Sequence, residues 1–256
     1  MEDTFIEISN LNKSFGGLKA LNDCSLKIKK NSITGIIGPN GSGKSTLFNL
    51  ITGNLKPDSG KVIFDKHEIT NKQSYDIFHL GILRTFQIAH EFSNLTTIEN
   101  LMMVPAFQKG EELITSIFFR KNFKSQEEKI KEKALETLKF LKIEHLKNEK
   151  ASNLSGGQKK LLELGRTMMV DAKIVFLDEV GAGVNKTLLN EISEMIIKLH
   201  KEKNYTFCII EHDIEFISKL CNPIIVLSEG SVLFEGSANE VKNNERVINS
   251  YLGKSI

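Results

Sequence analysis

Two stretches of this 256-residue chain have residue types that bind phosphate groups. The first, GPNGSGKS (Gly38–Ser45), fits the pattern G-x-x-x-x-G-K-S without a mismatch. Its glycines let successive backbone N–H groups face a triphosphate, Lys44 adds a charge for the β and γ phosphates, and the Ser45 hydroxyl can ligate Mg²⁺. An apolar run precedes the loop and a helix-like run follows it, as a phosphate loop requires. We therefore expect nucleotide contacts from Gly38, Pro39, Asn40, Gly41, Ser42, Gly43, Lys44, Ser45 and Thr46.

The second stretch is LSGGQKK, Leu154–Lys160. Its serine can cap a helix through its hydroxyl, and the two glycines after it open that helix, so that free backbone N–H groups face an anion. A phosphate loop already exists upstream, and the residues alone do not say what a second anion site holds. The candidate contacts are Ser155, Gly156, Gly157 and Gln158.

Acidic residues and a histidine follow two apolar runs, KIVFLDE and TFCIIEH. Asp178 can complete the coordination of Mg²⁺, usually through water, and Glu179 can orient an attacking water. His212 lies 33 residues after Glu179, at a strand end where open α/β sheets bind ligands. Its imidazole can contact a γ phosphate and hold the water, although a lone histidine is more often structural.

Two further residues have two readings each. Gln87, in RTFQ, is a candidate contact for Mg²⁺ or for water, or an ordinary surface residue. Phe15, in KSFGGLKAL, can stack on an adenine, or belong to the core as most single phenylalanines do.

The elements that must position these residues are readable from hydrophobic periodicity. Alternating apolar positions in Phe5–Ser9, Ser25–Lys29 and Lys61–Asp65 predict half-buried antiparallel strands. The continuous apolar character of KIVFLDE and TFCIIEH predicts central parallel strands covered by helices on both faces. The run Ile224–Ser237 predicts a strand, a turn at Glu229-Gly230 and a second strand.

Between Leu95 and Leu154 the sequence is helical and polar. Ile130, Ala134, Leu138 and Leu141 recur at the spacing of one helix face, which predicts an amphipathic helix with a solvated Lys/Glu surface.

Composition excludes several classes of protein. Apolar residues make up 40% and charged residues 26%, as in globular domains, and the net charge of +2 with interleaved acids argues against nucleic-acid binding. The three cysteines form no CxxC pair, which favours reduced thiols. No apolar run reaches the length of a membrane span and the start lacks a signal-peptide pattern, so we expect membrane contact only through a partner.

The phosphate loop, RTFQ, LSGGQ, FLDE and EH, in this order and spacing, resemble the ATP-binding subunit of ABC transporters across the whole chain. The resemblance implies an α/β P-loop NTPase (RecA-like) core with an N-terminal antiparallel β subdomain and an inserted α-helical subdomain. The implied boundaries within the single domain 1–256 are 1–88 and 166–256 for the core and 89–165 for the helical subdomain. ATP and Mg²⁺ are the implied cofactors, with Glu179 and His212 as catalytic residues and Ser45, Gln87 and Asp178 at the metal.

The same resemblance explains the second anion site. In that family the LSGGQ helix of one subunit caps the γ phosphate bound by another, so that two chains enclose two ATP molecules. The implied partners are a second ATPase subunit, identical or paralogous, permease subunits and, indirectly, a solute-binding protein. The implied location is peripheral, at the cytoplasmic face of the membrane, where Ser116–Phe123 could contact the permease or form subdomain core.

The segments FGGLKALND, RTFQ with LTTIENLMM, and SYLG are most similar to the LivG-type ATPases of branched-chain amino acid importers. The lipopolysaccharide-export ATPase and a soluble ABC ATPase without a transport role are the alternatives. Two residues depart from the common family pattern: Val180 replaces the proline after the glutamate, and Asn185 replaces an aspartate. A valine frees φ and adds an N–H, which bears on the geometry of the dimer interface.

Overall fold

The computed structural model describes residues 4–85, 91–105, 120–170 and 172–252. It divides into two compact units: the first comprises Met1–Gln87, Lys173–Ala182 and Leu189–Ile256, and the second Ile88–Ala172 and Gly183–Leu188. The second unit extends beyond the expected end at residue 165, because helix α6 (Gly156–Met168) continues past that point.

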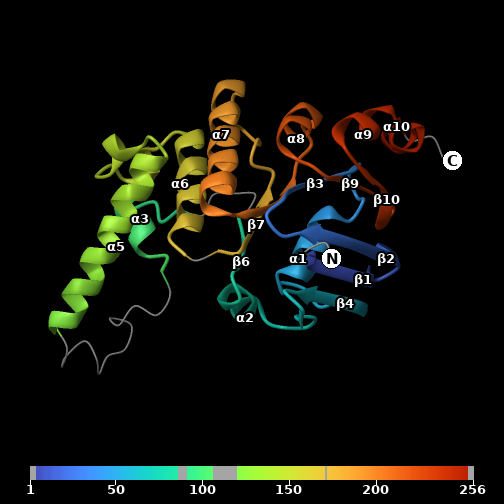
Figure 1. The fold of residues 1–256 in the computed structure, drawn as a ribbon, viewed down its shortest axis with the longest axis horizontal. Helices are drawn as coiled ribbons and strands as arrows, with labels where there is room; N and C mark the ends of the chain where they lie inside the picture. The colour runs from blue at the N-terminus through green and yellow to red at the C-terminus, as the bar shows by residue number, and fades with distance from the viewer. Residues whose placement is uncertain (1–3, 86–90, 106–119, 171, 253–256) are drawn as a thin grey trace. The chain divides into compact units, whose positions relative to one another are not determined.

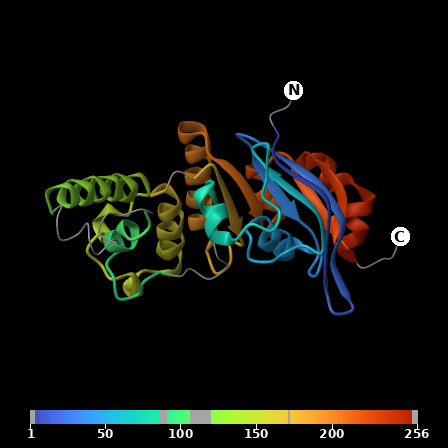
Figure 2. The ribbon, with the colours of Figure 1, turned by 90° about the horizontal axis from the view of Figure 1, so that it is seen from below.

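The first unit begins with an antiparallel sheet in the order β2-β1-β4-β5. Figure 2 shows β1 and β2 (blue) as one long hairpin. Apolar side chains alternate along β1, and Ile6, Ile8 and Leu11 are buried. The prediction of half-buried antiparallel strands is therefore confirmed. The strands are β1 (Thr4–Phe15), β2 (Leu18–Lys29), β4 (Ser59–Phe64) and β5 (His67–Glu68).

The second sheet of this unit has the order β10-β9-β3-β8-β7-β6 (Figure 1). Strands β9, β3, β8, β7 and β6 are parallel, and β10 is antiparallel to β9. Every residue of β3, β7 and β8 is buried, which confirms the prediction of central parallel strands. The bounds are β3 (Ile33–Ile37), β6 (Ile82–Arg84), β7 (Ile174–Asp178), β8 (Thr206–Ile210), β9 (Ile224–Ser228) and β10 (Ser231–Gly236).

One hydrophobic core joins both sheets of the first unit to helix α1. Phe48 of α1 meets Phe176 of β7 edge to face, with ring centroids 4.8 Å apart. Packing of α1 on the strands in this way fixes the direction in which its N-terminus points. The helices are α1 (Lys44–Ile51), α2 (Ser74–His79), α7 (Lys186–Lys203), α8 (Ile214–Leu220), α9 (Ala238–Asn243) and α10 (Glu245–Leu252), and α7 starts in the second unit.

The second unit is helical, with α3 (Thr97–Met102), α5 (Arg120–Phe140) and α6. In Figure 1, α5 runs beside α3 and α6, and the three pack on one another. Ala134, Leu138 and Leu141 are buried, as the helical spacing predicts, and Ile130 is half-buried. Short 3-10 turns at Glu144–Leu146 and Ala151–Asn153 connect α5 to α6.

The described residues contain no helix that is both long and apolar enough to cross a membrane. The three cysteines, Cys24, Cys208 and Cys221, are buried and free.

Candidate functional site

The phosphate loop lies between β3 and α1 and is packed against two other strands. Gly43 has φ 99°, and a Cβ there would lie 2.5 Å from the Ala20 carbonyl oxygen of β2. A Cβ on Gly38 would lie 2.1 Å from the Leu227 carbonyl oxygen of β9. Gly230, in the β9–β10 turn, donates its N–H to the Ser42 carbonyl at 3.2 Å. These contacts fix the shape of the loop. Gly38 and Gly43 must be glycine, because a Cβ atom at either position would collide with a backbone carbonyl oxygen.

No side chain caps the N-terminus of α1, so its first backbone N–H groups and its positive dipole end remain for an anion. Lys44, the first residue of the helix, is 6% exposed, and its Nζ donates to the carbonyl oxygens of Gly38 at 2.8 Å and Pro39 at 3.0 Å. Burial lowers the pKa of the Lys44 ammonium, whereas the charges of Glu179 and Asp178 raise it. The lysine and the two carboxylates thus interact electrostatically within one unit.

Asp178, the last residue of β7, is 5% exposed and is oriented by Arg84 of β6. Arg84 Nη2 lies 2.7 Å from Asp178 Oδ2, and Nη1 lies 2.5 Å from the Asn49 side-chain oxygen on α1. The guanidinium also lies over the Phe48 ring, 5.7 Å from its centroid. Arg84 therefore links the phosphate-loop helix to the acidic end of β7.

Asp178 and Ser45 are hard oxygen donors of the kind that Mg²⁺ accepts together with phosphate oxygens. Among the described residues no three His, Cys, Asp or Glu side chains are grouped as a metal site by themselves. The donor set therefore fits a metal held jointly by the protein and a nucleotide.

Glu179 and His212 meet at the ends of two neighbouring strands. His212 Nε2 lies 3.0 Å from Glu179 Oε1, with side-chain exposures of 47% and 22%. The Glu179 N–H donates to the Ile210 carbonyl at 3.0 Å, which holds the two strand ends together. His212 therefore contacts a specific carboxylate and is not a histidine buried in the core.

In the second unit, Ser155 caps α6 in a reciprocal capping box. Its hydroxyl accepts the Gln158 N–H at 3.3 Å, and the Gln158 side-chain oxygen accepts the Ser155 N–H at 2.9 Å. A Cβ on Gly156 would meet no atom within 4 Å, whereas one on Gly157 would lie 1.4 Å from Leu188 Cδ2. A helix therefore begins at LSGGQ, as predicted. Gly156 is exposed at its start, and Gly157 packs against Leu188.

Phe15 ends β1 next to the Gly16-Gly17 turn and is 47% exposed, so of its two interpretations the core position does not hold. Lys13 Nζ lies 5.6 Å from the centroid of the Phe15 ring. An exposed ring on a hairpin turn has a face on which a planar base can stack.

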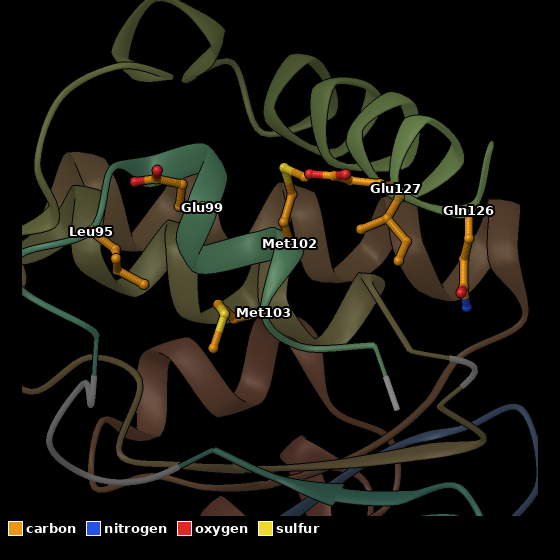
Figure 3. Close-up of a pocket in the computed structure, with 7 residues that line it drawn as sticks. Leu95, Glu99, Met102, Met103, Gln126 and Glu127 are labelled. Carbon is orange, nitrogen blue, oxygen red and sulfur yellow. The ribbon is translucent and has the colours of Figure 1, made fainter. Parts of the chain in front are cut away.

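A separate pocket of about 270 Å³ lies in the second unit between α3 and α5 (Figure 3). Figure 3 shows Met102 pointing toward Glu127 of α5. Hydrogen bonds from the side chain and backbone of Thr96 lower the pKa of Glu99, so this carboxylate stays ionised. The pocket therefore combines a lining of methionine and aliphatic side chains with two carboxyl groups. Its lining residues are Leu95, Glu99, Met102, Met103, Gln126, Glu127 and Ile130.

The first unit thus contains the phosphate loop, Asp178, Glu179 and His212, and the second contains Ser155–Gln158. Gln87 and residues 116–119 of the proposed permease contact lie outside the described residues.

Sequence reasoning missed two residues at the site, Arg84 and Glu211. Arg84 stands three positions before Gln87 in a motif already singled out. Glu211 is 5% exposed, and it interrupts an apolar strand run directly before His212. In both cases the sequence places a charged residue at the end of an apolar strand pattern, which could have indicated a role at the site.

Comparison with known proteins gives a match to the ABC transporter family over residues 21–182. A probable branched-chain amino acid transport ATP-binding protein LivG of Archaeoglobus fulgidus is 44% identical over 248 residues, 97% of this chain and 95% of the relative. A protein of the same description from Methanocaldococcus jannaschii is 41% identical over 260 residues, 99% of this chain and 100% of the relative.

Solved structures show the same fold. A nucleotide-free ATP-binding cassette from an ABC transporter aligns with a TM-score of 0.83 and 40% identity, covering 98% of this chain and 99% of that one. A bacterial ABC transporter cassette solved as a dimer aligns with a TM-score of 0.73 and 26% identity, covering 91% of this chain and 98% of that one.

Proposed function

This chain belongs to the ABC transporter family as an ATP-binding cassette, and we propose that it binds and hydrolyses ATP to drive a branched-chain amino acid importer. The observation that carries the proposal is the contact of His212 Nε2 with Glu179 Oε1, in the unit that holds the phosphate loop. A nucleotide loop beside an acid–histidine pair suits a hydrolase better than a passive binding module.

In this proposal the loop from Gly38 to Thr46 holds the phosphates of ATP. Backbone N–H groups and the N-terminus of α1 face the phosphate oxygens, and Lys44 exchanges its carbonyl partners for the β and γ phosphates. Phe15 stacks on the adenine with its exposed ring.

Mg²⁺, bound with ATP, would be held by Ser45, Asp178 and Gln87 and would neutralise charge on the phosphates. One oxygen of Asp178 is held by Arg84, and its other oxygen could serve as a ligand.

Hydrolysis itself is assigned to Glu179 and His212. Glu179 accepts a proton from the attacking water, as a general base does. His212 contacts both the γ phosphate and Glu179, and so keeps the water between them.

We assign the capped end of α6 to the nucleotide of a second ATPase subunit. A serine hydroxyl has one proton to donate, and that of Ser155 remains for a phosphate because its oxygen is an acceptor in the capping box. The exposed Gly156 lets a phosphate approach the helix N-terminus. The dimeric structure of a related cassette supports a pairing of this kind.

The permease partner is assigned to the pocket between α3 and α5. Methionine linings adapt to an inserted apolar side chain, and the carboxylates of Glu99 and Glu127 favour a neighbouring cation. The proposed occupant is an amphipathic permease segment carrying Lys or Arg, and the proposed location of the chain is the cytoplasmic face of the membrane. A solute-binding protein is then an indirect partner.

The test is reconstitution of the chain with its permease subunits in vesicles. A binding protein loaded with leucine, isoleucine or valine should raise the ATPase rate and drive uptake of labelled leucine, and lysine should do neither. A complex with Glu179→Gln is the inactive control. Stimulation by lipopolysaccharide instead would favour the exporter, and activity that needs no permease would favour a soluble ATPase.

A further inference from the structure

Glu211 is a buried carboxylate at the end of β8, directly before His212. Its Oε1 accepts the backbone N–H of Gly181 at 2.5 Å, and its Oε2 accepts the backbone N–H of His212 at 3.1 Å. One carboxylate therefore holds two loops, the loop that follows β7 and the loop that follows β8.

The loop after β7 needs such an anchor because its first residue has a strained backbone. Glu179 has φ 50°, a left-handed conformation that non-glycine residues seldom adopt. Strain of this kind persists only where the surroundings determine it. Backbone bonds from Glu179 to Ile210 and from Ala182 to Glu179 contribute, and the Gly181–Glu211 bond adds a side-chain anchor.

Val180 increases the need for that anchor. A proline at this position would fix φ near about −65° through its ring, whereas a valine leaves the torsion free to rotate. In this chain the residues on both sides of Val180 are held by hydrogen bonds, Glu179 by Ile210 and Gly181 by Glu211.

We propose that Glu211 is a positioning residue for ATP hydrolysis, which sets the place of Glu179 on one loop and of His212 on the next. The inference rests on the proposed assignment of these two as the hydrolytic pair. Their side chains lie 3.0 Å apart, so a shift of either loop by about 1 Å breaks the contact, and misplacement on that scale can slow catalysis about a hundredfold.

A carboxylate in this place is unfavourable unless its hydrogen bonds are used. Burial raises the pKa of the Glu211 carboxyl above its ordinary value, and the hydrogen bonds from Gly181 and His212 offset only part of that rise. A residue that only filled space in β8 would be apolar, like its neighbours Ile209 and Ile210. A residue that only capped the loop would affect stability on substitution, whereas a positioning residue affects kcat while ATP affinity stays constant.

The test compares Glu211→Gln and Glu211→Ala with Asp213→Asn in the full complex. Gln keeps the shape of Glu but replaces one of the two acceptor oxygens by an NH₂ donor, and Ala removes both acceptors. Asp213 caps α8 by accepting the backbone N–H groups of Glu215 and Phe216, and Asn caps equally well. We expect kcat to fall about tenfold for Gln and up to about a hundredfold for Ala, with Mg-ATP affinity within about twofold of wild type. Asp213→Asn should keep the wild-type kcat.

Single-turnover rates in the Glu179→Gln background separate positioning from general damage. If Glu211 acts by holding the Glu179 carboxylate against His212, the role is already lost with Gln at position 179, and adding Glu211→Gln there should lower the residual rate by less than about twofold. An undiminished drop in that background, or an equal loss of ATP binding, would overturn the proposal. A normal kcat for Glu211→Gln beside an inactive Glu179→Gln would overturn the positioning role alone. A normal kcat for Glu179→Gln would overturn the hydrolytic pair itself.

Discussion

The side chain of Leu188 occupies the space that a Cβ atom on Gly157 would need, with Cδ2 1.4 Å from that position. A Cβ on Gly156 would meet no atom within 4 Å. Two adjacent glycines of the same motif are therefore glycine for different reasons. Gly157 accommodates a packed neighbour, and Gly156 leaves the helix end accessible.

We therefore expect Gly157→Ala to be less stable than Gly156→Ala by about 1–2 kcal/mol, because the added methyl must displace Leu188. Both changes gain the same helix propensity, so each is a control for the other. Denaturant unfolding measures the difference. Adding Leu188→Ala should remove it, and a difference that survives this change would show that Leu188 is not the cause.

Lys44→Ala should weaken Mg-ATP binding by about 1.5–3 kcal/mol, because a charge-assisted contact with the phosphates is lost. Titration with a fluorescent nucleotide measures this. Lys27→Ala is the control, because Lys27 pairs with Glu7 on the surface of β2. Equal affinities for Lys44→Ala and wild type would remove the assignment of the phosphate loop.

Glu179→Gln should retain ATP binding and lower turnover on the order of 10²–10⁴-fold, because an amide cannot accept the proton of the attacking water. Binding without hydrolysis should trap an ATP-bound dimer, visible by size-exclusion chromatography. Turnover at the wild-type rate would mean that another residue is the base.

A mixture of two inactive variants tests whether Ser155 serves the nucleotide of a neighbouring subunit. One chain carries Lys44→Ala and the other Ser155→Arg, which puts a bulky cation at the helix end. With sites shared between subunits, a mixed dimer has one site with both defects and one with none, so phosphate release should partly return. With sites inside one chain, every site has a defect and activity stays absent.

The same experiment needs two controls. Ser155→Arg also removes a helix cap worth about 1 kcal/mol, so Ser155→Thr, which keeps the cap, should be tested beside it for folding. If the natural dimer pairs two different ATPases, the substitution equivalent to Ser155→Arg should be made in the partner ATPase instead. Absence of rescue in both arrangements would contradict the shared site.

The fold was predictable wherever one local pattern was strong. The continuous apolar run Thr206–Ile210 indicated a buried parallel strand, and the structure places β8 between β3 and β7. The face formed by Ala134, Leu138 and Leu141 likewise indicated the buried side of α5. These patterns are local, so the sequence alone displays them.

Contacts between distant segments were not predictable in this way. Arg84 and Asp178 are 94 positions apart, and only the pairing of β6 with β7 brings them together. Phe15 is a second case, because its residue type alone did not distinguish a core position from an exposed one, and only the hairpin turn beside it leaves the ring exposed. Which distant residues contact each other depends on how the strands are ordered in the sheet, and a single sequence does not show that order.

The capping box of α6 has a consequence for the speed and strength of closure in the proposed dimer. Ser155 and Gln158 hold each other in one rotamer through reciprocal hydrogen bonds. Their conformational entropy is therefore lost when the chain folds and not when a second subunit arrives. A preorganised surface of this kind docks without first rearranging its side chains. In the proposed dimer, the equilibrium between open and closed forms would then depend on the nucleotide, which is the component that hydrolysis changes.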